Sequence, residues 1–407
     1  MPYRIWSAAR RPIIATWSKE AAGFWDTAVA GSSALRVAMR RLVRAEAAVQ
    51  MGSHAAGIFY DAANSYDNFG LDQLIEKASD LNYPLLPLAM SAHMCLAPRA
   101  IMAHSLFFDV FEPANSMVAG CDQAVDLTKP LLYGALEAAH VNYIYVVIQQ
   151  YLDDLVLKIE GASKQVIEQV RYVAALVHQG FARLSIPISI KTAVVASDKG
   201  LQQEIANILD GVGTPNKQPG VVRDLGVDTG LGKQLKRPTH AARQAKAKQR
   251  IEKLKDLAKT DARGAAKVYA AGAHCQHAWD LPAHGITPTE AIKVRATEAA
   301  LLTGGHKAGR CTATILLIQR GAQEAVTRAI VDQVKQLWLT IVDHPSELKR
   351  WNQVKGTMTG VIVQLLGLGW NPRSSCALSN SSGSKRQSIG TAQDRRKGAT
   401  STSCKDT

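Results

Sequence analysis

The chain has 407 residues, of which 47% are hydrophobic, so it is long enough to bury a sizeable core in two or three domains. No window approaches eighteen uninterrupted apolar residues, and the N-terminal MPYRIWSAARRP lacks the apolar stretch of a secretory signal. We therefore expect a soluble, intracellular protein, nuclear or cytoplasmic, that is not secreted and does not contact a membrane. The six cysteines are scattered without framework spacing, which argues against a disulfide scaffold and against redox chemistry.

Charge is distributed unevenly along the chain. The formal net charge is +14, yet residues 51–160 contain thirteen acidic residues against four basic ones. An acidic centre between basic flanks is typical of a cation site bordered by a surface that binds a polyanion. Charge that serves only solubility is the alternative.

The first half of the chain alternates helical and strand patterns. Residues 32–50 form an amphipathic pattern that predicts a helix capped by Ser32 or Ser33, with Arg36, Arg40, Arg41 and Arg44 on the faces left by the apolar residues. A short buried strand is expected at 58–60, ending at Asp61. Helices are predicted at 71–81 and 84–102, a hairpin across 106–120, and a helix at 121–139 that contains Pro130.

The segment VVIQQYLDDLVLKIEG, residues 146–161, is the most informative part of the chain. Strands are predicted at 141–148 and 155–159, and the QQYLDD between them is short enough for a tight turn. A helix at 164–184, a strand at 188–196, a helix at 201–209 and a strand at 221–227 follow. This mixed order favours an α+β sheet over a regular βαβ array.

Beyond residue 228 strand patterns fade and positive charge rises. Ten basic residues stand against two acidic ones between Lys233 and Lys259, and Ile251, Leu254 and Leu257 recur at helical spacing. We expect a basic, helix-rich region up to about residue 370. Residues 371–407 lack the apolar content to order themselves. Their basic pairs, Lys385-Arg386 and Arg395-Arg396, are either nuclear-targeting signals or solvated charge.

Asp153 and Asp154 place two carboxylates between apolar runs, and Asp61 ends the earlier buried strand. Antiparallel neighbours in one sheet would bring Asp61 against the predicted turn. Carboxylates gathered at strand ends repel one another, and a divalent cation such as Mg²⁺ relieves that cost. Two such ions about 4 Å apart stabilise the attacking and leaving oxygens in phosphoryl transfer. The alternative is that each aspartate is a turn former.

Five segments, in this order, resemble the motifs of the reverse transcriptases of non-LTR retrotransposons. The resemblance covers roughly residues 1–310. The segment from Asp61 through Tyr66 to Asp67 resembles motif A, and Ala119-Gly120-Cys121 resembles motif B. Tyr151-Leu152-Asp153-Asp154 resembles motif C. The segment around Lys191 resembles motif D, and Leu225-Gly226 resembles motif E.

The resemblance implies a right-hand polymerase with partial fingers at 1–55, a palm at 56–228 and a helical thumb and connection at 229–370. Composition alone predicts the disordered basic tail at 371–407. The resemblance implies that two Mg²⁺ ions, with Mn²⁺ as a substitute, are held by Asp61, Asp153 and Asp154. It further implies that Lys191 lies near the leaving pyrophosphate.

In the same family pattern, Tyr66 lies under the sugar and excludes a 2′-hydroxyl, and Gly120 and Cys121 help position the nucleotide. Leu225 and Gly226 support the primer. The implied activity is RNA-directed DNA synthesis from deoxynucleoside triphosphates. An RNA template and a DNA primer would be bound partly through Arg243, Lys246, Arg250 and Lys253.

Two other interpretations stay open. Motif B departs from the family pattern at Ala119, Ala124 and Val125, and the first fingers strands are not recognisable, so the chain is alternatively a decayed element that binds nucleic acid without synthesis. A maturase of the group II intron type shares the palm and is the third interpretation.

Overall fold

The structure is a computed structural model that describes residues 2–63, 65–100, 102–104, 106–113, 115, 117, 121, 123–143, 145–231, 236–304, 311–320 and 324–344. The chain separates into two compact units, Met1–Ala242 and Arg243–Thr407. The segments predicted as fingers and palm both lie in the first unit. The predicted tail, 371–407, lies outside the described residues.

A four-stranded antiparallel sheet forms the centre of the first unit, which confirms the α+β prediction. Its strands are ordered β4 (Val146–Tyr151), β5 (Asp154–Gly161), β1 (His54–Tyr60) and β6 (Ala193–Ala196). Successive side chains of a strand point to opposite faces. Along β5, Leu155, Leu157 and Ile159 accordingly enter one apolar core and Val156 enters another.

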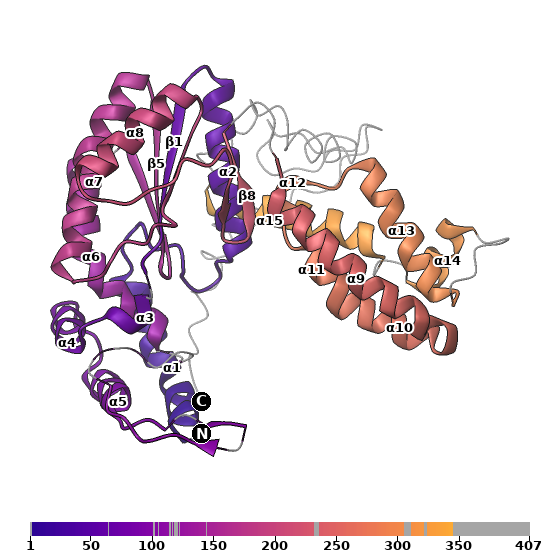
Figure 1. Ribbon diagram of the computed structural model, residues 1–407, viewed down its shortest axis with the longest axis horizontal. Coiled ribbons are helices and arrows are strands. Elements are labelled where there is room, and N and C mark those ends of the chain that lie inside the picture. The colour runs from indigo at the N-terminus through magenta and orange to yellow at the C-terminus, as the bar shows by residue number, and fades with distance from the viewer. Residues whose placement is uncertain are drawn as a thin grey trace, which may run out of the picture. The chain divides into compact units, whose positions relative to one another are not determined.

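Helices cover both faces of this sheet (Figure 1). The larger core lies under α6 (Ala124–Asn142), α7 (Ser163–Arg183) and α8 (Lys199–Gly211), and α2 (Ala34–Gln50) packs on the opposite face. Ser33 caps α2 by accepting a hydrogen bond from Arg36 N at 3.2 Å, as predicted. The small residues Ala45 and Ala48 let α2 approach the sheet closely.

Shorter elements complete the first unit. They are α1 (Pro2–Ala21), α3 (Ser65–Asn68), α4 (Leu71–Asp80), α5 (Leu85–Leu96), the small hairpin β2 (Met102–Ala103) with β3 (Leu106–Phe107), and the hairpin β7 (Val222–Asp224) with β8 (Val227–Thr229). Trp17 on α1 packs edge-on against Tyr83, with ring centroids 4.5 Å apart, and donates to Leu81 O at 2.8 Å. These contacts join α1 to the α4–α5 connection.

Several sequence predictions were wrong in their boundaries. The strand expected at 141–148 is β4 at Val146–Tyr151, because α6 continues to Asn142. The helix expected at 84–102 ends at Leu96, and the hairpin expected at 106–120 begins at Met102. The strand expected at 188–196 starts only at Ala193, because residues 189–192 turn. The strand expected at 221–227 is two strands joined by a turn at Leu225 and Gly226.

The second unit is helical over its described residues. Its helices are the greater part of α9 (Pro238–Thr260), α10 (Ala262–Val268), a π-helical turn (Tyr269–Ala273), α11 (His274–Ala278), α12 (Leu281–His284), α13 (Pro288–Leu302), α14 (Thr312–Gln319) and α15 (Ala325–Asp343). Leu254, Tyr269, Val294 and Leu301 are among its core residues. Glu298 is buried, binds Arg320 at 2.8 Å and accepts from Ala325 N at 3.0 Å, so its charge is compensated.

Gly180 sets how closely α6 and α7 pack. A Cβ at this position would lie 2.7 Å from Ala135 Cβ, and alanine has no rotamer with which to move away. We expect Gly180→Ala to destabilise the protein by about 1–3 kcal/mol, which outweighs the gain of about 1 kcal/mol in helix propensity. Urea unfolding followed by circular dichroism measures the difference.

The matched control is Gly134→Ala on α6. A Cβ there meets nothing within 4 Å, so the same change is expected to stabilise the protein by up to about 1 kcal/mol. Equal effects of the two variants would contradict the close approach of the helices.

Candidate active site

The turn between β4 and β5 carries the carboxylate pair. Tyr151 pairs with Asp154, so Leu152 and Asp153 alone form the loop, and the hairpin is tighter than the sequence indicated. Leu152 has φ 59°, the positive φ that the common two-residue hairpin turns require at their first position and that a leucine rarely adopts. Asp153 is therefore exposed at the tip of the turn, and Asp154 is half-buried as the first residue of β5.

Asp61 lies next to this turn through the register of the sheet. Tyr60 pairs with Leu155, so one further step along the antiparallel register sets Asp61 beside Asp154. The backbone of Asp61 is held from its other side, because its N donates to Thr192 Oγ1 at 3.2 Å and its O accepts from Ser189 N at 2.8 Å. The structure thus brings the predicted carboxylates of β1 and of the hairpin to one end of the sheet.

Electrostatics reflect this arrangement. Burial raises the pKa of Asp154 to about 6, with further increases from Asp153, Asp224 and Asp61, and Arg41 opposes them. The carboxylates therefore repel one another across the site. In the described part of the chain, however, the carboxylate oxygens of Asp61, Asp153 and Asp154 do not all lie within 4.8 Å of one another.

The three aspartates fit a divalent cation in chemistry. They offer only oxygen ligands, which Mg²⁺ and Mn²⁺ prefer, and a cation would remove the repulsion that raises the pKa of Asp154. Asp153 is exposed on the turn, so packing does not fix its rotamer. Asp61, Asp153 and Asp154 would be the residues that hold the ions.

Tyr66 on α3 lies close to the carboxylate pair. Its ring packs edge-on against Phe69 with centroids 6.3 Å apart, and the pKa of its hydroxyl is raised by burial and then by Asp153 and Asp154. Tyr66 is half-buried. The role that the resemblance implies for this residue stays a prediction.

Lys191 lies on the turn that holds Asp61. Its backbone N donates to Ser189 Oγ at 3.1 Å, and Ser189 N binds Asp61 O. The Lys191 side chain is exposed. The turn that holds Asp61 thus carries an exposed cationic side chain.

Cys121 packs against α1. Its Sγ lies 3.1 Å from the hydroxyl of Tyr3, and that hydroxyl is 3.0 Å from Ser91 Oγ. Burial, together with the contact with Cys121, raises the pKa of Tyr3. Gly120, the other residue predicted for nucleotide positioning, lies outside the described residues.

Leu225 and Gly226 form the β7–β8 turn, with φ of 48° and 84°. Both residues are in the left-handed region, as a type I′ turn requires. The residue before the turn, Asp224, is buried and forms an ion pair with Arg41 at 2.6 Å. This contact was not predicted from the sequence, and it places Arg41 inside the protein.

The prediction that Arg41 lies on a polar face of its helix was wrong. Arg41 follows Ala38 by three residues and precedes Ala45 by four, so it falls within the buried stripe of α2. That spacing was the available signal. Gln149 and Lys158, which also contact Arg41, were missed because they stand in strands whose apolar residues dominate the pattern.

Lys158 is buried on β5, and burial lowers its pKa to about 7. The unfolded chain, with the ordinary lysine pKa, binds more protons above pH 7, so the stability of the fold should rise between pH 7 and 10. We expect Lys158→Met to remove this rise and to stabilise the protein at pH 7 by about 1 kcal/mol or more. Urea unfolding at pH 7 and pH 9.5 measures both effects.

Lys164→Met is the control for that prediction, because Lys164 is exposed on α7. Its effect should stay within about 0.5 kcal/mol at either pH. A Lys158→Met variant that loses stability at pH 7 would contradict the inference that the buried charge of Lys158 destabilises the folded protein.

The residues predicted on the basic helix α9 differ in their surroundings. Lys246, Arg250 and Lys253 are exposed and recur at helical spacing, and the buried Ala247 and Leu254 lie on the neighbouring face of the helix. Arg243 instead lies 3.8 Å from the buried carboxylate of Asp280. The first three form a continuous cationic stripe that suits phosphate contacts.

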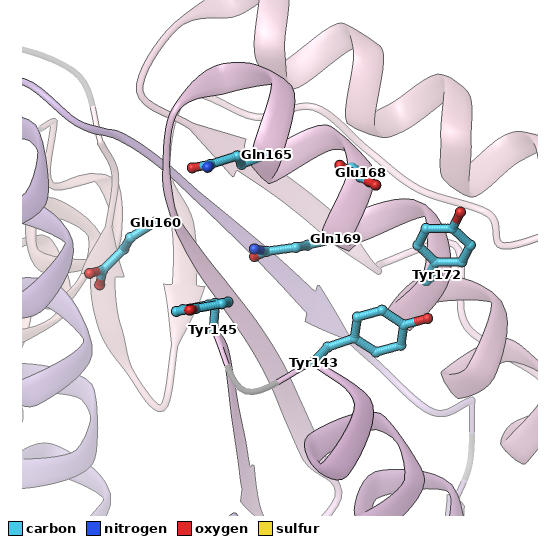
Figure 2. A pocket seen from close by; sticks show the side chains of 7 residues that line it. All are labelled: Tyr143, Tyr145, Glu160, Gln165, Glu168, Gln169 and Tyr172. Carbon is cyan, nitrogen blue, oxygen red and sulfur yellow. The ribbon is translucent and has the colours of Figure 1, made fainter.

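A separate cavity of about 480 Å³ lies at the other end of the β4–β5 hairpin (Figure 2). The rings of Tyr143 and Tyr172 stack on each other at one side of it, with centroids 5.6 Å apart and planes 8° apart. Its remaining lining residues are Tyr145, Glu160, Gln165, Glu168 and Gln169. The cavity contains none of the residues predicted for nucleotide chemistry.

No protein-family profile and no curated protein matches the sequence. In the described part of the chain, no helix is both long enough and apolar enough to cross a bilayer.

Solved structures similar to this chain include three of telomerase. Apo telomerase from Candida tropicalis matches at 11% identity and TM-score 0.41, covering 88% of this chain and 57% of that chain. The same enzyme with a TWJ fragment of telomeric RNA matches at 12% and 0.40, covering 88% and 52%. Candida albicans telomerase with such a fragment matches at 8% and 0.43, covering 86% and 57%. This chain spans little more than half the length of each of these proteins. TM-scores of this size do not support a functional assignment, so the proposal below is argued from the residues of this chain.

Proposed function

We propose that the chain is the polymerase part of a reverse transcriptase of the non-LTR retroelement type. The observation that carries the proposal is the convergence of Asp61, the Asp153-Asp154 turn and Tyr66 at one end of the antiparallel sheet. The order of these residues in the sequence is the order of the family's motifs. In this assignment residues 56–228 are the palm and the helices from α9 onward are the thumb.

The reaction is nucleotidyl transfer to a primer. The 3′-hydroxyl oxygen of the primer bonds to the α-phosphorus of a deoxynucleotide and loses its proton to solvent. The bond from that phosphorus to the bridging oxygen breaks, so that pyrophosphate leaves. Bound Mg²⁺ supplies charge neutralisation and lowers the pKa of the hydroxyl. The chain's own residues hold the ions through Asp61, Asp153 and Asp154.

The remaining residues position the substrates. Tyr66 lies under the sugar, and Lys191 neutralises or protonates the departing pyrophosphate. The Leu225-Gly226 turn supports the primer backbone. Lys246, Arg250 and Lys253 contact template-primer phosphates, which positions the duplex without reading its sequence.

Primer extension tests the proposal. The purified chain, given an RNA template with an annealed DNA primer, Mg²⁺ and deoxynucleotides, should lengthen the primer, and chelation of the metal should stop the reaction. Ribonucleotides should be poor substrates. Absence of extension, while the salt-sensitive binding of template-primer is retained, would reject synthesis and favour the alternative below.

The second candidate is a protein that binds nucleic acid but does not synthesise. The contact between Cys121 and Tyr3 favours it, since the thiol predicted to help position the nucleotide packs against α1. Ala124 and Val125, which begin α6, also depart from the motif B pattern. This candidate predicts binding through α9 with no incorporation under any metal.

A further inference from the structure

Arg41 joins three elements near the carboxylate turn. It is the largest fully buried side chain of the described residues. Its Nη1 donates to Asp224 Oδ1 on β7 at 2.6 Å, its Nε to Gln149 Oε1 on β4 at 3.0 Å, and its Nη2 to Gln149 O at 3.3 Å. One guanidinium on α2 thus binds the β7–β8 hairpin and the strand that leads into the Asp153-Asp154 turn.

The β7–β8 hairpin needs an external anchor. Each strand has three residues, and the hairpin is a sheet of its own without pairing to the four-stranded sheet. A two-stranded hairpin of this size is marginal in isolation. Apolar contacts of Val222 and Leu231 hold it against α2 and the sheet, and Arg41 binds Asp224, the residue directly before the Leu225-Gly226 turn.

Arg41 also contacts the hairpin that carries the aspartates. Gln149 is buried on β4, two residues before Tyr151, which pairs with Asp154. Arg41 O also accepts a hydrogen bond from Lys158 Nζ on β5. Arg41 is therefore bonded to both strands of the hairpin that carries the aspartates.

Stability alone is a weak reason for this arrangement. Buried ion pairs are often replaced by apolar residues with no loss of stability. Apolar residues cannot reproduce a planar fork that donates to two acceptors in fixed directions. The feature that is specific to arginine here is the fixed geometry between the two turns.

We propose that Arg41 is a positioning residue that fixes the Leu225-Gly226 turn relative to the Asp153-Asp154 turn, and so determines how a primer end meets the carboxylates. The proposal rests on the proposed function, because the first turn is assigned to the primer there. It adds a residue from outside the motif series to the active site.

The test replaces the pair with apolar residues, Arg41→Met together with Asp224→Leu. We expect this variant to fold and to bind template-primer and nucleotide within about threefold of the parent. The rate at saturating nucleotide should fall tenfold or more, because the primer end is misplaced while the binding surfaces remain. A folded double variant with the parental rate overturns the proposal.

Arg41→Lys decides the matter if the double variant does not fold. Lysine keeps the charge, but its single ammonium cannot reproduce the guanidinium's separate donors to Asp224 and Gln149. Its rate at saturating nucleotide should fall at least threefold, and a parental rate overturns the proposal. Arg44→Met is the matched control, because Arg44 lies one turn along α2 and binds Glu160 at 2.9 Å, at the far end of β5. Its rate should stay within threefold of the parent.

Hydrogen exchange separates this proposal from the proposed function. In the folded double variant, or in Arg41→Lys in its place, amides of 222–229 should exchange at least tenfold faster, whereas those of 146–161 should be unchanged. Parental protection of 222–229 overturns the anchor. Failure of the parent to extend a primer rejects the polymerase, and the exchange result then still shows whether Arg41 holds the hairpin.

Discussion

Asp153→Asn is expected to lower the rate of deoxynucleotide incorporation by about a hundredfold or more. Asparagine has the size of aspartate but lacks the charge that holds a divalent cation and compensates the charge of the triphosphate. Asp153 is exposed at the tip of a two-residue turn, so the change should leave the fold intact. Single-turnover primer extension with Mg²⁺ measures the rate.

Asp109→Asn makes the same change at an exposed aspartate outside the site and should keep the parental rate. Thermal unfolding of all three proteins shows whether either variant has lost stability. Incorporation by Asp153→Asn within a few fold of the parent would contradict the role of this carboxylate and, with it, the proposed mechanism.

The parts of the site predicted correctly from the sequence are those that local patterns determine. Two apolar runs rich in Val, Ile and Leu around YLDD favour a hairpin, which sets Asp153 and Asp154 at or directly beside its turn. Asp61 directly follows a buried strand, so its place at a sheet end follows from that strand. Its position beside Asp154 depended on β1 pairing with β5, which the structure confirms.

The Leu225-Gly226 turn was missed for a local reason. Two-residue turns of this type favour Asn-Gly or Asp-Gly. Leucine does not favour the positive φ of 48° that Leu225 adopts, so its presence does not predict a turn. A strand pattern therefore ran through it. The residue before the turn, Asp224, is instead held in place by its buried ion pair with Arg41.

The environment of Arg41 was beyond sequence reasoning for a different reason. Its carboxylate partner stands 183 positions away along the chain, and no local pattern links them. The position of Arg41 in the helical pattern indicated a buried side chain, whereas its charge indicated an exposed one. The structure shows that burial prevails when Asp224 and Gln149 satisfy the guanidinium.

Tyr66→Ala is expected to raise the use of ribonucleotides relative to deoxynucleotides by tenfold or more. The Tyr66 ring lies near the Asp153-Asp154 pair, so its volume occupies space beside the sugar of a nucleotide held there. A hydroxyl that clashes with a fixed ring is rejected by steric cost, and alanine removes that cost. Competition between ribo- and deoxynucleotides in primer extension measures the ratio of kcat/KM values.

Tyr66→Phe keeps the ring and should keep the parental selectivity, which separates the effect of volume from that of the hydroxyl. Alanine also removes the packing against Phe69, so a stability loss of about 1–3 kcal/mol is expected, and the assay belongs well below the unfolding midpoint. An alanine variant that incorporates deoxynucleotides with unchanged selectivity would contradict the proposal that the Tyr66 ring lies beside the sugar. Because the carboxylates do not depend on this ring, that result would leave their role intact and place the discrimination elsewhere in the site.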